Sequence, residues 1–376
     1  MTTPHIVVLG AGYTGVTAAK LLAKRTGATV TVVNNRDHFV ERMRNHQLAS
    51  GHQLRQLSLR SLFQGTGIRL IIDQVTQIDT AARQVELGRG AEPVGYDLLV
   101  YALGSHADLD TVPGVAEHAF AVADAEGAER LRDRVRTTEA VAVVGAGPTG
   151  LETATALAET YPDRTVRLVT RGALGEALSE RAREYLRRAL DRLGIQVWEH
   201  ADVAKVDAGG LLLEGGEHLD AGAVAWTTGF TVPELARQAG LAVDDHGRML
   251  VDGTLRSQSH PEVYGIGDAA AAHSRNGQVL RMGCGPGGLA AACAFRAIAG
   301  RLAGRTPKPL HGSIDALCIS LGRRDGVLQP TDLDGSPRGM VLTGRPVAML
   351  KNAVLSVTGR YSPRYPALVL AGARQG

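Results

Sequence analysis

The chain has 376 residues, more than one hydrophobic core usually supports, so we expect two or three domains. Apolar residues make up 44% and charged residues 21%, which excludes a disordered, collagenous or coiled-coil chain. A net charge of +3 and an aromatic content of 4% provide neither the basic face nor the stacking platforms of a nucleic-acid binder, and no nucleic-acid partner is expected.

The sequence shows no signal for export, membrane insertion or metal binding. From Met1 it runs into the apolar segment 6–9 without a charged leader, and no window approaches the roughly 20 apolar residues of a spanning helix. Cys284, Cys293 and Cys318 lack CxxC spacing, and the 12 histidines show no metal-ligand clustering. We therefore expect a cytoplasmic protein without a metal site.

Two copies of a strand–helix–strand unit organise the chain. The first has strand character at 6–10, helical apolar spacing over 13–24 and a second strand at 29–33; the second copy repeats this order at 141–145, 148–159 and 165–170. Other predicted elements are strands at 68–78, 83–87 and 97–101, a helix at 176–193, and strands near 195–198, 203–207, 211–214 and 223–226.

This order predicts an α/β fold with two Rossmann-like dinucleotide-binding domains. We expect the first domain to be discontinuous, at 1–110 and 251–312, and the second to be inserted at 111–250. A small C-terminal region then occupies 313–376.

A Gly-rich turn joins strand to helix in both copies. Gly10-Ala11-Gly12-Tyr13-Thr14-Gly15 fits G-x-G-x-x-G in the context that gives this pattern meaning. Gly10 permits the tight turn, Gly12 lets a pyrophosphate approach the backbone, and Gly15 lets helix and strand pack closely. Because Gly145-Ala146-Gly147-Pro148-Thr149-Gly150 repeats the pattern, we expect two bound dinucleotides, each with its phosphates at a helix N-terminus.

Neither copy has the carboxylate that often accepts from the adenosine ribose at the end of the second strand. Asn34 and Asn35 stand there in the first copy, and an amide accepts more weakly than a carboxylate. In the second copy Arg171 can pair with a 2′-phosphate, so we expect this half to accept or prefer NADPH; the alternative is a solvated arginine. Arg42 is a candidate contact for an adenosine phosphate, with a solvated face as the alternative.

A third Gly-rich stretch ends a strand at Gly267-Asp268, where a carboxylate can be directed at a ribitol hydroxyl. With Tyr101-Ala102-Leu103-Gly104-Ser105 and the two turns, it resembles the flavoprotein superfamily with the pyridine nucleotide–disulfide oxidoreductase fold, over residues 5–320. The resemblance implies that the inserted domain binds NAD(P)H, and that Gly229 and Pro286 also contact a cofactor. It further implies that FAD is held by the first turn, Val75, Ala102, Leu103, Gly104, Gly267 and Asp268.

The cysteines indicate which branch of this superfamily the chain resembles. Its disulfide reductases carry a redox-active cysteine pair, and its sulfide-oxidising members need paired cysteines in both halves. Here Cys284 and Cys293 are nine residues apart with an expected helix between them, too far for an unforced bridge. We therefore expect flavin alone to pass electrons from the nicotinamide to the acceptor.

Several segments resemble the type II NADH:quinone oxidoreductases and the apoptosis-inducing-factor-like and ferroptosis-suppressor-like quinone reductases. Gly150-Leu151-Glu152 looks like their Gly-Val-Glu signature, and 281–290 and 319–326 resemble their later stretches. The resemblance places Glu152 at the nicotinamide end; the alternative is an exposed helix carboxylate. Arg281 stands where ferroptosis-suppressor-like members have Lys, and since a guanidinium donates no proton at neutral pH, its implied role is to stabilise the charge of reduced flavin.

The chain ends in a basic segment. From Pro337 to Gly376 it has six basic residues and no acid. An amphipathic helix is predicted at 346–358, because apolar residues recur there at helical spacing: Val347, Leu350, Val354 and Val357. This helix can either contact the inner face of a membrane peripherally or pack on the flavin domain.

These observations predict an FAD-dependent NAD(P)H oxidoreductase that passes electrons to a quinone-like acceptor, with Glu152 and Arg281 as catalytic residues. Two alternatives stay open. One is an FAD-dependent reductase or oxidase of a small metabolite, or a reductase of an electron-carrier protein. The other is a flavin-bearing binding protein that senses redox state.

Overall fold

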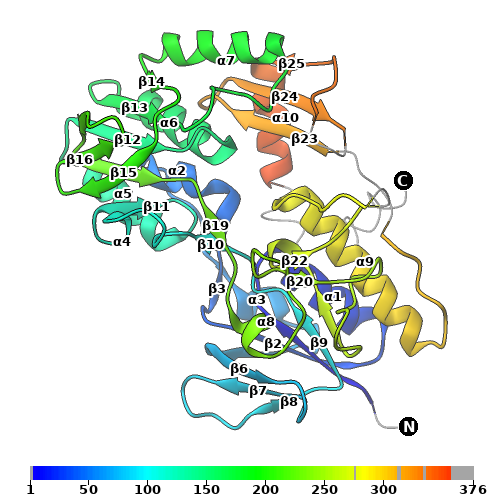
Figure 1. The fold of residues 1–376 in the computed structure, drawn as a ribbon. Helices are drawn as coiled ribbons and strands as arrows, with labels where there is room; N and C mark the ends of the chain where they lie inside the picture. The colour runs from blue at the N-terminus through cyan, green and yellow to red at the C-terminus, as the bar shows by residue number, and fades with distance from the viewer. Residues whose placement is uncertain (1–2, 275–276, 311–314, 333–335, 357–376) are drawn as a thin grey trace.

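The computed structural model describes residues 3–274, 277–310, 315–332 and 336–356, and two five-stranded parallel sheets form its framework (Figure 1). In the first sheet the strand order is β21-β9-β1-β2-β5. The four residues Ile6 to Leu9 of β1 are fully buried, as expected of a central strand covered on both faces. The strands are β1 (His5–Leu9), β2 (Thr29–Asn34), β5 (Arg69–Ile72), β9 (Leu98–Tyr101) and β21 (Val263–Gly265).

The second sheet has the order β11-β18-β12-β13-β14 and lies beside the first in the upper left of Figure 1. Its central strand, like β1, is an apolar run with Val141, Ala142 and Val143 fully buried. Its strands are β11 (Ala119–Ala121), β12 (Ala140–Val144), β13 (Thr165–Val169), β14 (Gln196–Trp198) and β18 (Ala223–Trp226). The prediction of an α/β fold with two Rossmann-like sheets is confirmed.

Helices connect the parallel strands in both units. Between β1 and β2 runs α1 (Tyr13–Arg25), which packs on α9 (Cys284–Leu302). Between β12 and β13 runs α6 (Pro148–Thr160), and the second unit also contains the longer helices α5 (Ala125–Val135) and α7 (Glu180–Arg192). The predicted helix at 176–193 begins later, at Glu180, because Ser179 has an extended backbone and is the N-cap.

Each unit also contains a small antiparallel sheet. The strand β17 in one of them was not predicted. The three-stranded sheets are β6 (Val75–Asp79), β7 (Gln84–Leu87), β8 (Val94–Gly95), and β15 (Val203–Asp207), β16 (Gly210–Leu213), β17 (His218–Asp220). Shorter elements are β3 (His38–Phe39), η1 (Arg42–Arg44), α2 (Asn45–Ala49), β4 (Leu57–Ser58), α3 (Leu59–Phe63) and α4 (Val115–His118).

The chain enters the second unit through β10 (His106–Ala107) and leaves it through β19 (Phe230–Thr231), and these two strands pair antiparallel. After β19 come α8 (Leu235–Gln238) and β20 (Met249–Leu250), and β20 pairs with β22 (Ala270–Ala271) just after η2 (Gly267–Ala269). The apolar core around the first sheet includes Ala236, Leu241 and Met249. The predicted boundary at 250 therefore falls too late, because the chain has already rejoined the first unit soon after β19.

One short helix of the first unit is displaced toward the second. In Figure 1, α2 is the blue helix that lies among the green and cyan elements, and it packs on α5 and α6. Its Asn45 side chain donates to the Val122 carbonyl at 3.0 Å, and Leu48 and Ala49 belong to the apolar core of the second sheet.

The C-terminal region forms an antiparallel sheet of β23 (Asp315–Ser320), β24 (Gly326–Thr331) and β25 (Leu342–Thr343). Ile319 and Val327 join the apolar core of the second sheet. The fully buried Gln329 ties β24 to the start of α7, since its side-chain oxygen accepts from the Ser179 hydroxyl at 2.6 Å. This region is therefore packed on the inserted unit.

The last described helix, α10 (Arg345–Ser356), matches the predicted helix in position but turns a different face inward. Val347 and Leu355 are buried, whereas Leu350 and Val354 of the predicted apolar stripe are each 46% exposed. Its main packing partners are β23 and β24, so the alternative of packing on the flavin domain is wrong. Val357 and the basic residues 360, 364 and 374 lie outside the described residues. None of the helices in the described ranges is long and apolar enough to cross a bilayer.

The third glycine of each Gly-rich turn sets the distance between helix and strand. A Cβ on Gly15 would overlap the Gly10 carbonyl oxygen, and one on Gly150 would overlap the Gly145 carbonyl oxygen. The middle glycine of the second turn, Gly147, is different, because a Cβ there would meet no atom within 4 Å.

We expect Gly150→Ser to lower the free energy of unfolding by about 2 kcal/mol or more, because the helix must move away from the strand. The matched variant Gly147→Ser should change it by less than about 0.5 kcal/mol, since serine is a favoured N-cap residue. Urea unfolding monitored by circular dichroism measures both values. Equal destabilisation by the two variants would contradict this packing.

Candidate functional site

The two Gly-rich turns share a geometry that suits phosphate. Beside Gly12 and Gly147 the space where a side chain would stand is open. Each of these glycines is the N-cap of its helix and supplies no side-chain cap. An anion placed there meets the positive end of the helix dipole and the N–H groups of the first turn.

Three predicted segments converge around the first turn. Gly10 lies against the backbone of Ala102 and Leu103, next to Gly104, whose φ is 69°. A Cβ on Gly267 would lie 3.0 Å from the Thr14 hydroxyl, and one on Gly287 would lie 2.9 Å from the Thr14 methyl group. The turn, the Gly267-Asp268 stretch and the start of α9 therefore form one cradle.

Asp268 is the polar centre of this cradle. Its Oδ2 accepts from the Ser105 hydroxyl at 2.8 Å, and its Oδ1 accepts from the Gly283 N–H at 3.0 Å. Arg42 lies 4.0 Å from Oδ2 and donates to the Ser105 carbonyl at 2.6 Å. Burial lowers the pKa of Arg42. Arg42 is thus held by partners at the Asp268 side of the cradle, and the alternative of a freely solvated side chain is wrong.

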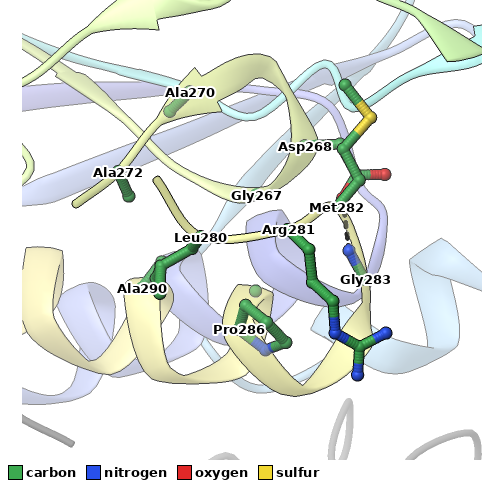
Figure 2. A pocket seen from close by; sticks show the side chains of 11 residues that line it. Gly267, Asp268, Ala270, Ala272, Leu280, Arg281, Met282, Gly283, Pro286 and Ala290 are labelled. Carbon is green, nitrogen blue, oxygen red and sulfur yellow. Dashed lines mark hydrogen bonds between the residues drawn. The ribbon is translucent and has the colours of Figure 1, made fainter. Parts of the chain in front are cut away.

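Figure 2 shows the hollow between this centre and α9. Asp268, Leu280, Arg281 and Pro286 line it, together with small residues such as Ala290. The Arg281 side chain extends alongside Pro286, and its guanidinium donates to the Ala316 carbonyl at 3.0 Å. Arg281 therefore reaches from the rim of the hollow to β23, and its contact with a cofactor stays a prediction.

Asn34 supports the first turn from the end of β2. Its side-chain oxygen accepts from the Ala11 N–H at 2.9 Å, and its amide donates to the Arg36 carbonyl at 2.8 Å. The residue thus holds the turn in shape, a role that the sequence pattern does not reveal. Asn35 follows it on the exposed side of the strand end.

Arg171 follows the corresponding strand of the second unit. Its side chain is 82% exposed, and its guanidinium pairs with the carboxylate of Asp202, which comes from the loop before β15. The structure therefore supplies an acid at this place that the sequence pattern alone did not indicate.

The other predicted cofactor residues take varied positions. Val75 is buried at the start of β6, and the Tyr13 ring packs edge-on against Phe39 with centroids 4.8 Å apart. Pro148 is the first residue of α6, and the Thr149 carbonyl accepts from the Thr153 hydroxyl at 2.7 Å. Gly229 has a φ of 66°, and its carbonyl accepts from the backbone N–H of Asp108 where the chain leaves the second unit.

A buried charged cluster forms where three parts of the chain meet. Glu152, on α6 and two residues beyond the second turn, is 7% exposed, so the alternative of an exposed carboxylate is wrong. Its Oε1 accepts from the Ser320 N–H at 3.0 Å and from the ammonium of Lys351. Lys351 also donates to the Cys318 carbonyl at 2.6 Å. On the other side, Nδ1 of His46 lies 3.6 Å from Oε2 of Glu152.

Burial controls the ionisation of both bases in this cluster. It lowers the pKa of Lys351 to about 7, since the charged ammonium loses its solvation. Burial, and then the charges of Lys351 and Arg44, lower the pKa of His46 to about 3. At neutral pH the cluster therefore holds a neutral imidazole beside a lysine that gains and loses its proton near pH 7.

Sequence reasoning identified Glu152 but missed Lys351 and His46. Lys351 was counted as one of six basic residues on a surface segment, and its partner lies 199 positions away in the chain. One signal was present: Lys351 falls between Val347 and Leu355 at a spacing of four, on the face that is buried.

The described cysteines do not form a redox pair. Cys293 is buried and Cys318 half-buried, and both carry thiols. Burial raises the pKa of the Cys293 thiol to about 11, which keeps it protonated and unreactive at neutral pH. Cys284 and Cys293 lie on one helix, about 13 Å apart along its axis, well beyond disulfide range.

Comparisons with known proteins agree with this geometry. Residues 4–282 match the family model of the pyridine nucleotide-disulphide oxidoreductases. An NADH dehydrogenase-like protein of Mycobacterium tuberculosis is 32% identical over 311 residues, covering 74% of this chain and 76% of the relative. The demethylphylloquinone reductase of Synechocystis is 26% identical over 307 residues, covering 74% of each chain.

A solved structure shows the same fold over almost the whole chain. NDH2 of Plasmodium falciparum in complex with NADH superimposes with a TM-score of 0.82, at 15% identity, covering 98% of this chain and 97% of that one. The chain matches the family model and has two sheets of the dinucleotide-binding type, each with a Gly-rich turn. It therefore belongs to the pyridine nucleotide-disulphide oxidoreductase family.

Proposed function

We propose that this protein is a flavoenzyme that oxidises NADH and passes the electrons to a quinone. One observation carries the choice of acceptor: the Lys351 ammonium, with a side chain only 12% exposed, is paired with Glu152 directly beyond the second Gly-rich turn. Burial lowers the pKa of this lysine to about 7. A quinone takes up protons together with electrons, and such a lysine can deliver one. The quinone-reducing relative from Synechocystis supports the same choice.

The residues of the first cradle suit FAD. Open space beside Gly12 and the start of α1 would receive the pyrophosphate, and the Asp268 carboxylate would accept from a ribityl hydroxyl. When bound, FAD supplies the chemistry that accepts a hydride and releases electrons one or two at a time. Arg281 and the start of α9 would place positive charge at the rim of the same hollow.

The side chains of the cluster would supply the proton that the quinone takes up. NADH, one proton and a quinone give NAD⁺ and a quinol, so one proton must come from solvent. The Lys351 ammonium would donate it to a quinone oxygen, and the Glu152 carboxylate would hold the ammonium in place. Because burial lowers the pKa of Lys351 to about 7, the group is charged below pH 7 and loses its proton above it.

We expect Lys351→Met to slow reoxidation of the NADH-reduced protein by menadione about 100-fold, the usual scale for loss of a positioned acid. Glu152→Gln should slow it as well, and the wild-type rate should fall as pH rises through 7. Bleaching of the flavin by NADH should change less than threefold. Stopped-flow absorbance at the flavin band measures both half-reactions, and Lys205→Met, at an exposed lysine, is the control.

Two outcomes would overturn the assignment. If menadione does not reoxidise the wild-type protein but a ferredoxin-type carrier does, the acceptor is a protein. If no acceptor reoxidises it, the protein is a redox sensor.

We also propose that NADH is preferred over NADPH, in place of the preference expected from Arg171 alone. Asp202 offsets the charge of Arg171 and would lie close to a 2′-phosphate paired with that guanidinium. Like charges at this distance disfavour binding.

Asp202→Asn should therefore tighten NADPH binding by up to about fivefold, the limit for an exposed ion pair, and leave NADH binding unchanged. Arg171→Ala should weaken NADPH binding only. Calorimetric titration of each variant with both nucleotides checks this. A change of the same size for NADH would contradict the proposal.

We further propose peripheral contact with an anionic membrane through the outer face of α10. Met349 is 72% exposed and Leu350 46%, and Met340 and Leu342 continue the apolar surface just before the helix. Arg338 and Arg345 flank it. Apolar side chains bordered by arginines suit the boundary between headgroups and acyl chains.

The double variant Met349→Glu, Leu350→Glu should abolish co-sedimentation with phosphatidylglycerol vesicles, while Leu302→Glu, at an exposed apolar residue of α9, should not. Higher salt should weaken wild-type binding, because part of the attraction is electrostatic. Equal sedimentation of wild type and double variant would rule out this surface.

A further inference from the structure

We propose that His46 is the residue through which a proton from solvent returns to Lys351, by way of the Glu152 carboxylate. This inference rests on the proposed function, because it concerns how the proton donor is recharged after each turnover. The observation that carries it is the position of one carboxylate between two bases, with all three side chains at most 12% exposed.

The carboxylate offers a separate oxygen to each base. Glu152 Oε1 faces the Lys351 ammonium and the Ser320 N–H, while Oε2 faces Nδ1 of His46 at 3.6 Å. A distance of 3.6 Å is longer than a hydrogen bond, so a small movement of the ring closes it. Glu152 can therefore accept a proton on one side and release it on the other.

The position of His46 in the fold fits a link toward solvent. It lies on α2, the helix displaced onto α6, one turn after Arg42 of the flavin cradle. Its own side chain is only 6% exposed, but His52, six residues further along the chain, is half-buried. Past α2 the chain reaches His52, whose ring lies near enough to affect the charge of His46 and contacts the Ser50 hydroxyl at 3.1 Å.

The charges around His46 make its protonation depend on Lys351. Glu152 faces it from α6, Lys351 from α10, Arg44 from η1, and His52 from the segment after α2. The positive charges of Lys351 and Arg44 disfavour the imidazolium. The positive charge of Arg44 is partly compensated by the Glu41 carboxylate, 3.4 Å away. In the proposed reaction, Lys351 is the neighbour of His46 whose charge changes.

One proton enters the cluster from solvent for each proton that the quinone receives from Lys351. The Lys351 ammonium gives one proton to the quinone oxygen and becomes a neutral amine. The Glu152 carboxylate then lacks its counter-charge, and the His46 imidazole takes up one proton from water. The new proton enters the ring at Nε2, and the Nδ1 proton passes to Oε2 of the Glu152 carboxylate. Rotation of the carboxyl group carries that proton to the Lys351 amine, and tautomer exchange returns the remaining ring proton to Nδ1, which restores the starting state with one proton consumed.

The kinetic test uses His46→Ala and His46→Gln in the FAD-loaded protein. Each should slow sustained turnover with NADH and menadione at least tenfold at pH 8, where recharging of Lys351 is most demanding. Free imidazole should restore the His46→Ala rate, since it can occupy the emptied space. The exposed His218→Gln, an imidazole paired with Asp207 and Asp220, is the control.

A titration without any acceptor tests the same coupling separately. In protein labelled at histidine, NMR should show that Lys351→Met raises the pKa of His46 by at least one unit, because the nearest changing positive charge is gone. Control resonances such as His218 should not move. This measurement keeps its meaning even if menadione proves to be the wrong acceptor.

Three results would overturn the inference. The first is normal turnover in His46→Gln. The second is a loss in His46→Ala that imidazole does not restore and that is equal at all pH values, as a structural role would give. The third is an unchanged pKa of His46 in Lys351→Met.

Discussion

The carboxylate of Glu152 receives an N–H group from β23 and an ammonium from α10, and it faces an imidazole from α2. These partners come from the C-terminal region and from the first unit, while Glu152 itself belongs to the inserted unit. A buried charge of this kind is tolerated only with a partner, and removing one member of such a pair costs about 3–5 kcal/mol. The position of the C-terminal region therefore depends on the Lys351–Glu152 pair, in addition to the apolar packing of Ile319 and Val327.

The same contacts explain why a helix as short as α2 matters. Arg42, just before it, is bound to Ser105 and lies beside Asp268, and His46, within it, lies beside Glu152. One turn of chain thus connects the cradle proposed for FAD with the cluster proposed to hold the proton. Asn45 fixes this segment to the second unit through the Val122 carbonyl. A shift between the two units would therefore disturb both places together.

The features that the sequence predicted correctly depend on residues that are close together in the chain. The sequence pattern correctly predicted the close packing of helix and strand at Gly15 and Gly150, because turn, strand and helix are adjacent in the chain. Lys351 could not be paired with Glu152 in this way, because their contact depends on how the C-terminal sheet docks. For the same reason the apolar stripe of α10 was assigned to the wrong face: Leu350 and Val354 are apolar but exposed, and the buried face includes a lysine. Asp202 was missed because it comes from a different loop than Arg171.

We propose that the cradle around the first Gly-rich turn holds a flavin and that the second Gly-rich turn holds a reduced nicotinamide, so that electrons pass from one to the other. An anaerobic titration of the purified protein with NADH, followed in the visible spectrum, tests it most directly. We expect a yellow protein whose flavin band disappears with one equivalent of NADH. A protein that stays colourless after incubation with FAD, or whose flavin NADH leaves unchanged, would contradict the account.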